Sequence, residues 1–256
     1  MEISEILDRI HRATGRFERE AVEAAMERKK EIAPELLEIL RKSLLTLENA
    51  PEMWAQVDPL ADYTAHLYSI YLLGQFREPR AHGLLTRFGM LPAKFLEPLS
   101  GDFIMCEFAR ALAYTATDTK AIQLLVENRD ASMVARIAAL ESIPYLVGFG
   151  RLDRAAAILY FRELFNKKLE RKRSGLWEFL FCFAGELCAA ELLPEARRAL
   201  HDGLLSSESD LEVIENSLGE EWEGFGRPLL LMRSRPKSLD ITAGDGWWRR
   251  RSRYAV

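Results

Sequence analysis

Apolar residues recur along most of this chain at three- and four-residue intervals, and no useful length of it alternates apolar and polar residues as a strand does. After Pro34, leucines follow the helical spacing at positions 36, 37, 40, 44 and 47. This pattern predicts an amphipathic helix with Pro34 in its first turn. A second helix is predicted from Asp58, as N-cap, and Pro59 through Leu73. The hydrophobic pattern therefore predicts an all-α protein.

Four later segments share an alanine followed, one helical turn on, by apolar residues. The alanines are Ala81, Ala121, Ala155 and Ala196, at successive offsets of 40, 34 and 41 residues. A more apolar stretch precedes each of them, at residues 63–75, 104–115, 132–147 and 177–190. Two helices in a period of about 40 residues are typical of HEAT and armadillo repeats, whose pairs stack to cover their apolar faces. We predict a right-handed α-α superhelix, with an irregular helical bundle as the alternative.

The charge distribution sets the end of the chain apart from the rest. The formal net charge is −4, but residues 227–256 hold eight basic and two acidic residues, which is +6, whereas residues 202–223 hold eight carboxylates and no Lys or Arg. Glycines and prolines beyond Gly226 break helical continuity. We therefore predict a helical repeat domain over residues 1–226 and a flexible, basic, Trp- and Arg-containing tail over 227–256.

The remaining composition favours a cytoplasmic protein. The three cysteines are an odd number in apolar helical sequence, which fits buried, reduced thiols and no disulfide framework. The N-terminus is acidic and amphipathic, unlike a signal peptide. The longest uncharged apolar stretch, residues 63–76, is shorter than the roughly 18 residues that a membrane span needs. No transmembrane segment is predicted.

Residues 66–81, together with Gly101, Asp102, Glu107, Arg110 and Leu112, resemble a bacterial domain-of-unknown-function family, number eleven eighty-six. Residues 17–25 and 210–215 are similar to that family as well, so the likeness spans about residues 17–219. The resemblance implies a helical-repeat fold without an established activity. Some relatives carry a C-terminal Cys-rich SEC-C zinc motif, but no cysteine follows Cys188 here, so a zinc-dependent role is not carried over.

Polar residues mark one stretch of the predicted 58–73 helix. Asp58, Asp62, His66 and Ser69 fall on one face at three- and four-residue spacing. Two ligands do not make a metal site, and the simplest interpretation is that Asp58 caps the helix while Asp62 and His66 pair or face solvent. Around this stripe, His66, Tyr68 and Tyr71 are the residues predicted to line a groove, if the fold has one.

The following linker places three charges in four positions, including Arg77 and Glu78, in a layout that suits recognition of a carboxylate or phosphate. Asp102, after Gly101, has the pattern of an N-cap, and Glu107 and Arg110 have the spacing of an intrahelical ion pair. The simplest role of these groups is structural. The full candidate contact surface is His66, Tyr68, Tyr71, Arg77, Glu78, Asp102 and Arg110.

Motifs for catalysis and cofactor binding are missing from the sequence. The cysteines lie in apolar surroundings, which raise rather than lower the pKa of a thiol. There is no Gly-x-Ser-x-Gly elbow, Walker loop, Rossmann glycine run, His-Glu-x-x-His or Cys-x-x-Cys. We therefore predict no catalytic residue, no cofactor and no metal, and the sequence favours a protein that is not an enzyme.

Two basic clusters give a different possibility. One spans residues 167–173, and the other spans 249–253 beside Trp247, Trp248 and Tyr254. Arginine with aromatics can hold nucleic-acid phosphates and bases, or settle at an anionic membrane surface. The simpler interpretation is a solvated helix end for the first cluster and attraction to the acidic residues 212–223 for the second.

The leading functional prediction is a non-catalytic scaffold or adaptor that binds a protein through the concave surface of the helical stack. One alternative is a nucleic-acid-binding helical repeat that uses residues 167–173 and the basic tail. Another is an enzyme or small-molecule binder whose groove includes His66 and Arg77. The sequence predicts no particular oligomeric state.

Overall fold

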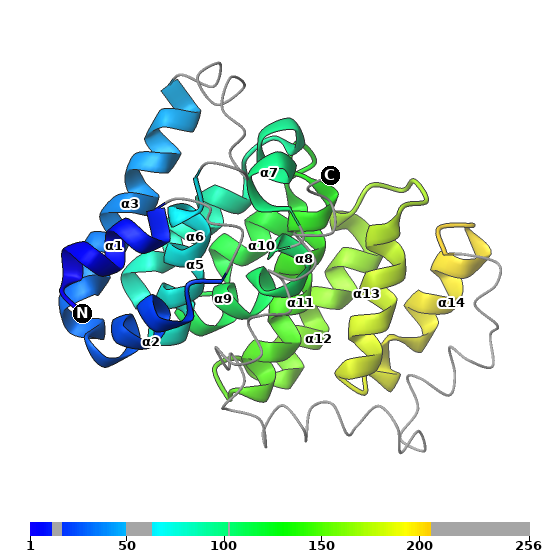
Figure 1. Cartoon of the computed structure of the whole chain (residues 1–256). Helices are drawn as coiled ribbons and strands as arrows, with labels where there is room; N and C mark the ends of the chain where they lie inside the picture. The colour runs from blue at the N-terminus through cyan, green and yellow to red at the C-terminus, as the bar shows by residue number, and fades with distance from the viewer. Residues whose placement is uncertain (12–16, 50–62, 102, 206–256) are drawn as a thin grey trace. The chain divides into compact units, whose positions relative to one another are not determined.

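A computed structural model describes residues 1–11, 17–49, 63–101 and 103–205, and every regular element in this part of the chain is a helix (Figure 1). The α-helices are α1 (Ile3–His11), α2 (Arg19–Glu27), α3 (Lys29–Asn49), α5 (Ala65–Phe76), α6 (His82–Gly89), α7 (Ala93–Ser100), α8 (Phe103–Cys106), α9 (Phe108–Thr115), α10 (Lys120–Glu127), α11 (Met133–Gly148), α12 (Arg154–Glu163), α13 (Gly175–Glu186) and α14 (Leu193–His201). Short 3-10 turns η1 (Pro79–Ala81) and η3 (Ala190–Leu192) precede α6 and α14, and a π-helical turn, η2 (Leu164–Lys168), ends α12. None of the described helices is both long and apolar enough to cross a bilayer.

The predicted all-α class and the order of the helices are confirmed. Each of the four apolar stretches forms a helix (α5, α9, α11 and α13), and each of the four alanine-containing segments falls in or at the start of the helix that follows it (α6, α10, α12 and α14). Between α6 and α9 the chain inserts α7, which the predicted period did not include, and the single helix predicted over 104–115 is divided into the four-residue α8 and α9. The right-handed superhelical stacking of these pairs remains a prediction.

Two predicted helix starts were wrong. Helix α3 begins at Lys29, so Pro34 is its sixth residue and not part of its first turn. Ile32 and Ala33, upstream of the proline, are buried, and this burial explains why the helix extends past Pro34 toward its N-terminus. Helix α5 begins at Ala65; Asp58, Pro59 and the rest of residues 50–62 lie outside the described residues.

The chain divides into two compact units, and among the described residues the division falls within α11, after Ala138. In the first unit, α5 is the central helix: it contacts α1, α2, α3, α9 and η1. All residues of α5 from Ala65 to Gly74 are buried. A helix that is apolar all round is stable in water only when neighbours cover every face, and α5 has those neighbours.

Helix α6 packs closely against α9 and α10 through Gly89. A Cβ atom added at Gly89 would lie 2.6 Å from Leu125 and 3.0 Å from Phe108. The missing side chain therefore sets the distance between α6 and the next helix pair. In the second unit, α12 contacts α13, η2 and η3, and Trp177, Phe161 and Phe165 are buried there.

Three of the described turns that join the two helices of a pair share one hydrogen-bonding pattern, which the end of α14 also has at Gly203. At the end of α5, the Arg77 amide donates to the Gly74 carbonyl and the Glu78 amide to the Leu73 carbonyl, with Arg77 in the left-handed region at φ 53°. This is the Schellman motif. Glycine takes the left-handed position after α11 (Gly150, φ 68°) and cysteine takes it after α13 (Cys188, φ 49°), with the same two bonds at each. The turn from α9 to α10 lacks this geometry, with Ala116 at φ −52°.

Candidate functional site

Three of the predicted contact residues lie inside the core. His66, Tyr68 and Tyr71 are each at most 1% exposed because α5 is covered by neighbours on all sides. The His66 Nε2 atom lies 2.8 Å from the carbonyl oxygen of Leu99, and the Tyr68 hydroxyl accepts a hydrogen bond of 3.0 Å from the Glu18 amide. The prediction that these three side chains line a groove or a contact surface was wrong.

The polar stripe around His66 is also buried. The imidazole stacks on Tyr63, with ring centroids 5.5 Å apart and an angle of 7° between the planes. Ser69, one turn further along α5, is fully buried, and His66 does not face solvent, which was one of its two predicted arrangements. Asp58 and Asp62 lie outside the described residues. His66 joins α5 to the end of α7, which is a packing role.

Arg77 remains at the surface. It ends α5 in the left-handed conformation, and its guanidinium carbon lies 4.8 Å from the centre of the Tyr114 ring on α9. Tyr114 is 6% exposed, so the ring is a fixed platform for the cation. In the described part of the chain, the Arg77 side chain makes no hydrogen bond and no ion pair.

Glu78 begins η1 and organises its first turn. Its carboxylate accepts hydrogen bonds from the Arg80 amide at 3.1 Å and from the Arg80 guanidinium at 2.8 and 2.9 Å. These bonds from Arg80 hold the pKa of Glu78 below its usual value. The carboxylate is therefore already occupied.

Arg110 and Glu107 form the predicted intrahelical pair at the start of α9. The two side chains are 2.7 Å apart, and Glu107 is buried while Arg110 is partly exposed. Asp102, the remaining member of the predicted set, lies outside the described residues. Contacts of α9 with α5 and η1 place Arg77, Glu78 and Arg110 in one part of the first unit.

Tyr114, on which the Arg77 guanidinium stacks, was not among the residues predicted from the sequence. Its position four residues after Arg110 is the available signal, because side chains four apart share a helix face. Nothing in the sequence indicates that Arg77 reaches that face, since the contact depends on the left-handed turn. We name Arg77, Glu78, Arg80, Glu107, Arg110 and Tyr114 the arginine surface.

The described thiols have no activating neighbours. Cys182 reaches solvent, contrary to the prediction that it is buried, and Cys188 is partly exposed. Partial desolvation, and then the charges of Glu186 and Glu178, raise the pKa of Cys182. A raised thiol pKa leaves little thiolate for nucleophilic chemistry. Among the described residues, no three His, Cys, Asp or Glu side chains are grouped as a metal site requires.

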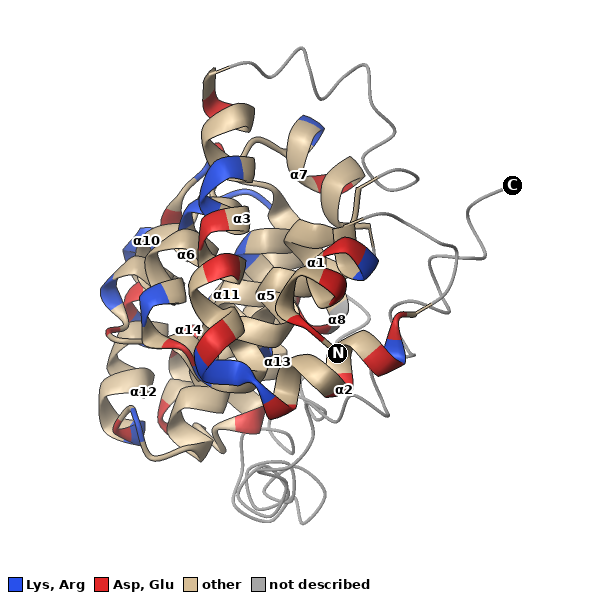
Figure 2. Cartoon of the chain, turned by 60° about the vertical axis from the view of Figure 1, so that its left-hand side comes forward, with Lys and Arg blue, Asp and Glu red and all other residues tan. Residues whose placement is uncertain are grey.

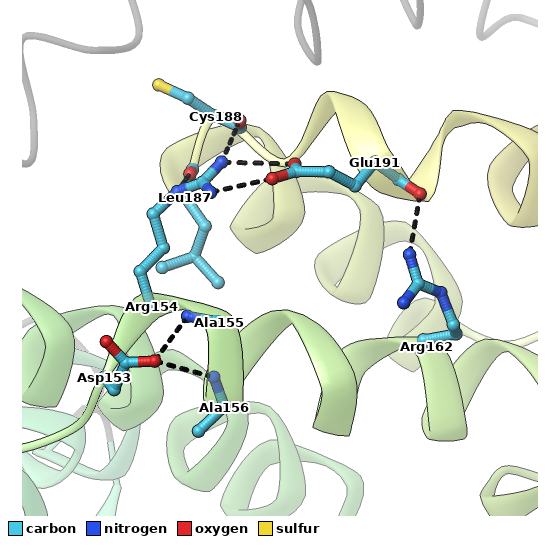
Figure 3. Close-up of polar contacts among 8 residues, drawn as sticks. All are labelled: Asp153, Arg154, Ala155, Ala156, Arg162, Leu187, Cys188 and Glu191. Atoms are coloured by element: carbon cyan, nitrogen blue, oxygen red, sulfur yellow. Dashed lines mark hydrogen bonds and ion pairs between the residues drawn. The ribbon is translucent and has the colours of Figure 1, made fainter.

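In the second unit, Arg154 links α12 to the end of α13 and has a structural role (Figure 3). Arg154, on α12, donates to the carbonyls of Leu187 and Cys188 at 2.9 and 2.5 Å and pairs with Glu191 at 2.8 Å. Asp153 caps α12 by accepting from the amides of Ala155 and Ala156. Arg154 thus satisfies the carbonyls that the end of α13 leaves open.

Three of the five basic residues in the cluster at residues 167–173 pair with neighbouring carboxylates. Lys167 and Lys168 both pair with Glu163, and Arg171 pairs with Asp202. Lys172 and Arg173 are exposed. The second cluster, at 249–253, lies outside the described residues. Helices α1, α2 and α3 carry both acidic and basic residues (Figure 2).

Two titratable groups, the partly buried Glu186 and the buried His82, stand apart from the arginine surface. On α13, burial and the nearby charge of Glu141 raise the pKa of Glu186 to about 7. On α6, His82 is 3% exposed, and neither of its ring nitrogens has a hydrogen-bond partner of good geometry within the described part of the chain. Burial lowers the pKa of His82, and the opposing influence of Asp118 is smaller.

The fold and the site define an all-helical protein whose helix pairs are joined by tight turns, with an ordered arginine exposed at one of them. The chain belongs to the family described as a protein of unknown function (DUF1186), whose model matches residues 1–236. The predicted family resemblance is confirmed.

Two relatives come from chlamydiae. One is an uncharacterized protein of Chlamydia muridarum (strain MoPn / Nigg), and the other is an uncharacterized protein of Chlamydia trachomatis serovar D. Each is 34% identical over 225 residues, which cover 86% of this chain and 86% of the relative. No solved structure matches the chain significantly.

Proposed function

We propose that this chain is a non-catalytic protein-interaction module, a scaffold or adaptor, whose contact surface includes Arg77, Glu78 and Arg110. The observation that carries the proposal is where the candidate side chains lie. The candidate histidine and tyrosines, whose side chains could take part in catalysis, are buried in packing contacts. The charged candidates, Arg77, Glu78 and Arg110, lie at the surface on a turn and a neighbouring helix. Groups arranged in this way suit contact with a macromolecule.

Exposed apolar side chains of the same unit support a protein partner. Met105 on α8 is 64% exposed and Leu124 on α10 is 53% exposed. Single exposed apolar residues are common, so they add support only together with the arginine surface. Protein interfaces combine apolar contacts with a charged and polar rim, and arginine is enriched in them.

We further propose that the helix pairs stack as a right-handed superhelix. The repeated turn supports this proposal. Among the described turns within helix pairs, the left-handed residues Arg77, Gly150 and Cys188 are 73 and 38 residues apart, which fits a period of about 37 residues with one unmarked pair between the first two. A regular turn repeated at this spacing is what a solenoid of helix pairs needs.

Site-specific photo-crosslinking in living cells tests the interaction proposal. A photoreactive residue at Arg80, whose side chain is 60% exposed, is compared with one at Lys42 on α3, whose side chain is 71% exposed. We expect a discrete protein adduct at position 80 that is absent at position 42 and weakened by Arg77→Gly. No adduct at position 80, or the same adducts at both positions, would overturn the proposal.

A further inference from the structure

We propose that Arg77, held on the Tyr114 ring, is the receptor for a side-chain carboxylate of an acidic segment in a protein partner. This inference rests on the proposed interaction function and specifies the chemistry of the partner. Three features of the arginine surface support it: the backbone of Arg77, the stacking of its side chain, and the pairing of its neighbours.

The backbone holds Arg77 in one place. Its amide and that of Glu78 close the Schellman motif with Gly74 and Leu73, at 3.0 Å each. The same left-handed position is glycine after α11 and again after α14, at Gly150 and Gly203. Left-handed backbone disfavours any residue with a Cβ atom, so packing and turn geometry do not explain an arginine here. A side-chain role does explain it.

The side chain is ordered by stacking. With the guanidinium carbon 4.8 Å from the centre of the Tyr114 ring, the aromatic platform restricts a side chain that is otherwise flexible. A guanidinium that rests on a ring keeps the N–H groups at its edges available, and two of them match the two oxygens of a carboxylate. Because the side chain is already ordered, binding costs less conformational entropy than it would for a free arginine.

The neighbouring carboxylates are occupied by other arginines. Glu78, the next residue, pairs with Arg80 at 2.8 Å, and Glu107, on the helix of Tyr114, pairs with Arg110 at 2.7 Å. The arginine surface therefore carries three positive and two negative charges, a net +1, and among the described residues Arg77 is the member of its cations that has no carboxylate partner. A single carboxylate neutralises that charge.

The net charge of +1 on the arginine surface favours a carboxylate ligand over a phosphate. A phosphate monoester carries close to two negative charges, and proteins recognise it with clusters of arginines. Arg80 and Arg110 are engaged by their own carboxylates, and Glu78 and Glu107 would repel a dianion. The partner segment we infer is therefore rich in Asp or Glu and is not phosphorylated at the contact.

Titrating the full-length protein with three synthetic peptides tests this inference, using the NMR signal of the Arg77 Nε–H group. The probes are a tetraglutamate peptide, a tetraglutamine peptide and a phosphoserine peptide, all with blocked ends. We expect the tetraglutamate peptide to shift this signal, to be displaced by salt, and to bind at least about tenfold more tightly than the tetraglutamine peptide. Equal binding of the glutamine peptide, or tighter binding of the phosphoserine peptide, would overturn the inference.

Variants complete the test. Arg77→Gly removes the side chain but suits the left-handed backbone, so the variant keeps its fold, and Arg77→Lys keeps the charge without the planar fork. We expect about a tenfold loss of tetraglutamate affinity in Arg77→Gly, read from signals of α9, and a smaller loss in Arg77→Lys. Unchanged affinity in Arg77→Gly contradicts the inference.

The crosslinking and peptide experiments separate this inference from the proposed function. If position 80 crosslinks to a partner but tetraglutamate has no effect on the protein, the acidic contact is refuted and the interaction function stands. If tetraglutamate binds but no partner crosslinks, the interaction function is refuted.

Discussion

At the scale of single residues, the left-handed positions are the most unusual feature of this chain. Four helix ends use the Schellman motif, and two of them place glycine at the left-handed residue, while Arg77 and Cys188 take it in the other two. A residue with a Cβ atom costs about 1 kcal/mol or more in this conformation. For Arg77 we infer a binding role, whereas the backbone carbonyl of Cys188 is held by Arg154.

We expect Cys188→Gly to stabilise the protein by about 0.5 kcal/mol, because relief of the backbone strain exceeds the entropy that glycine adds to the unfolded chain. The matched control is Gly150→Ala, which has open space around it and should lose about 1 kcal/mol from the backbone alone. Urea denaturation of the full chain measures both. If Cys188→Gly were destabilising, the left-handed assignment at Cys188 would be wrong.

The buried carboxyl of Glu186 predicts a pH dependence. Its pKa is about 7 in the folded protein and near 4.5 when unfolded, so the folded state holds the proton between these values and stability falls as pH rises from 4.5 to 7. The loss amounts to at most roughly 3 kcal/mol, at 1.36 kcal/mol for each pKa unit. We expect Glu186→Gln to remove this slope and to be more stable than the wild type at pH 8.

Stability curves from pH 5 to 8 for wild type, Glu186→Gln and Glu178→Gln provide the measurement. Glu178 lies on the same helix and serves as the charge-matched control, which should keep the slope of the wild type. If stability depended on pH in Glu186→Gln as it does in the wild type, the raised pKa of Glu186 would be contradicted.

His82 gives a dependence of the opposite sign. Because burial lowers its pKa in the folded state, the unfolded chain binds the proton first, and stability falls as pH drops below about 6.5. We expect His82→Leu to lose this acid sensitivity and, at pH 7, to be as stable as the wild type or about 1 kcal/mol more stable, since an unsatisfied polar ring is replaced by an apolar side chain. Thermal unfolding at pH 5.5 and 7.5 distinguishes the two proteins, and equal acid sensitivity would argue against a buried, unprotonated His82.

At the scale of elements, the contact of α6 with α9 and α10 depends on a missing side chain. A methyl group at Gly89 would overlap Leu125 and crowd Phe108, so we expect Gly89→Ala to cost about 1–3 kcal/mol. Gly83, on the same helix, has nothing within 4 Å, and Gly83→Ala should be neutral or stabilising by up to about 1 kcal/mol. Circular dichroism during chemical denaturation measures both, and equal effects of the two substitutions would contradict the close packing.

The helices themselves could be predicted from the sequence, but their ends and their burial could not. Three- and four-residue spacing identified the apolar helices α5, α9, α11 and α13 because periodicity depends on local sequence. The start of α3 before Pro34 depends on the burial of Ile32 and Ala33, and the short helix α7 lies outside the repeat pattern. Those features arise from tertiary contacts, which a single sequence does not reveal.

Only part of the candidate site could be predicted, because the burial of its side chains also depends on tertiary contacts. Arg77, Glu78 and Arg110 lie at the surface with the charge patterns expected of them, but His66, Tyr68 and Tyr71 are core residues. An apolar helix with a few polar groups has the same sequence pattern whether one of its faces is open or all are covered. Only the five elements packed around α5 decide between these cases.

At the scale of the whole molecule, the family and the all-helical fold are established, and the interaction function is our proposal. In the described residues, α5 buries His66, Tyr68 and Tyr71, and the turn after it exposes Arg77, which stacks on Tyr114 and makes no ion pair there.

The most direct test of the central claim is the affinity of the crosslinked partner, once purified, for the wild type and for Arg77→Gly at low and high salt. We expect Arg77→Gly to weaken binding by about tenfold or more at low salt and the difference to shrink at high salt, because screening weakens the ionic contact. Equal affinities of the two proteins at low salt would contradict it.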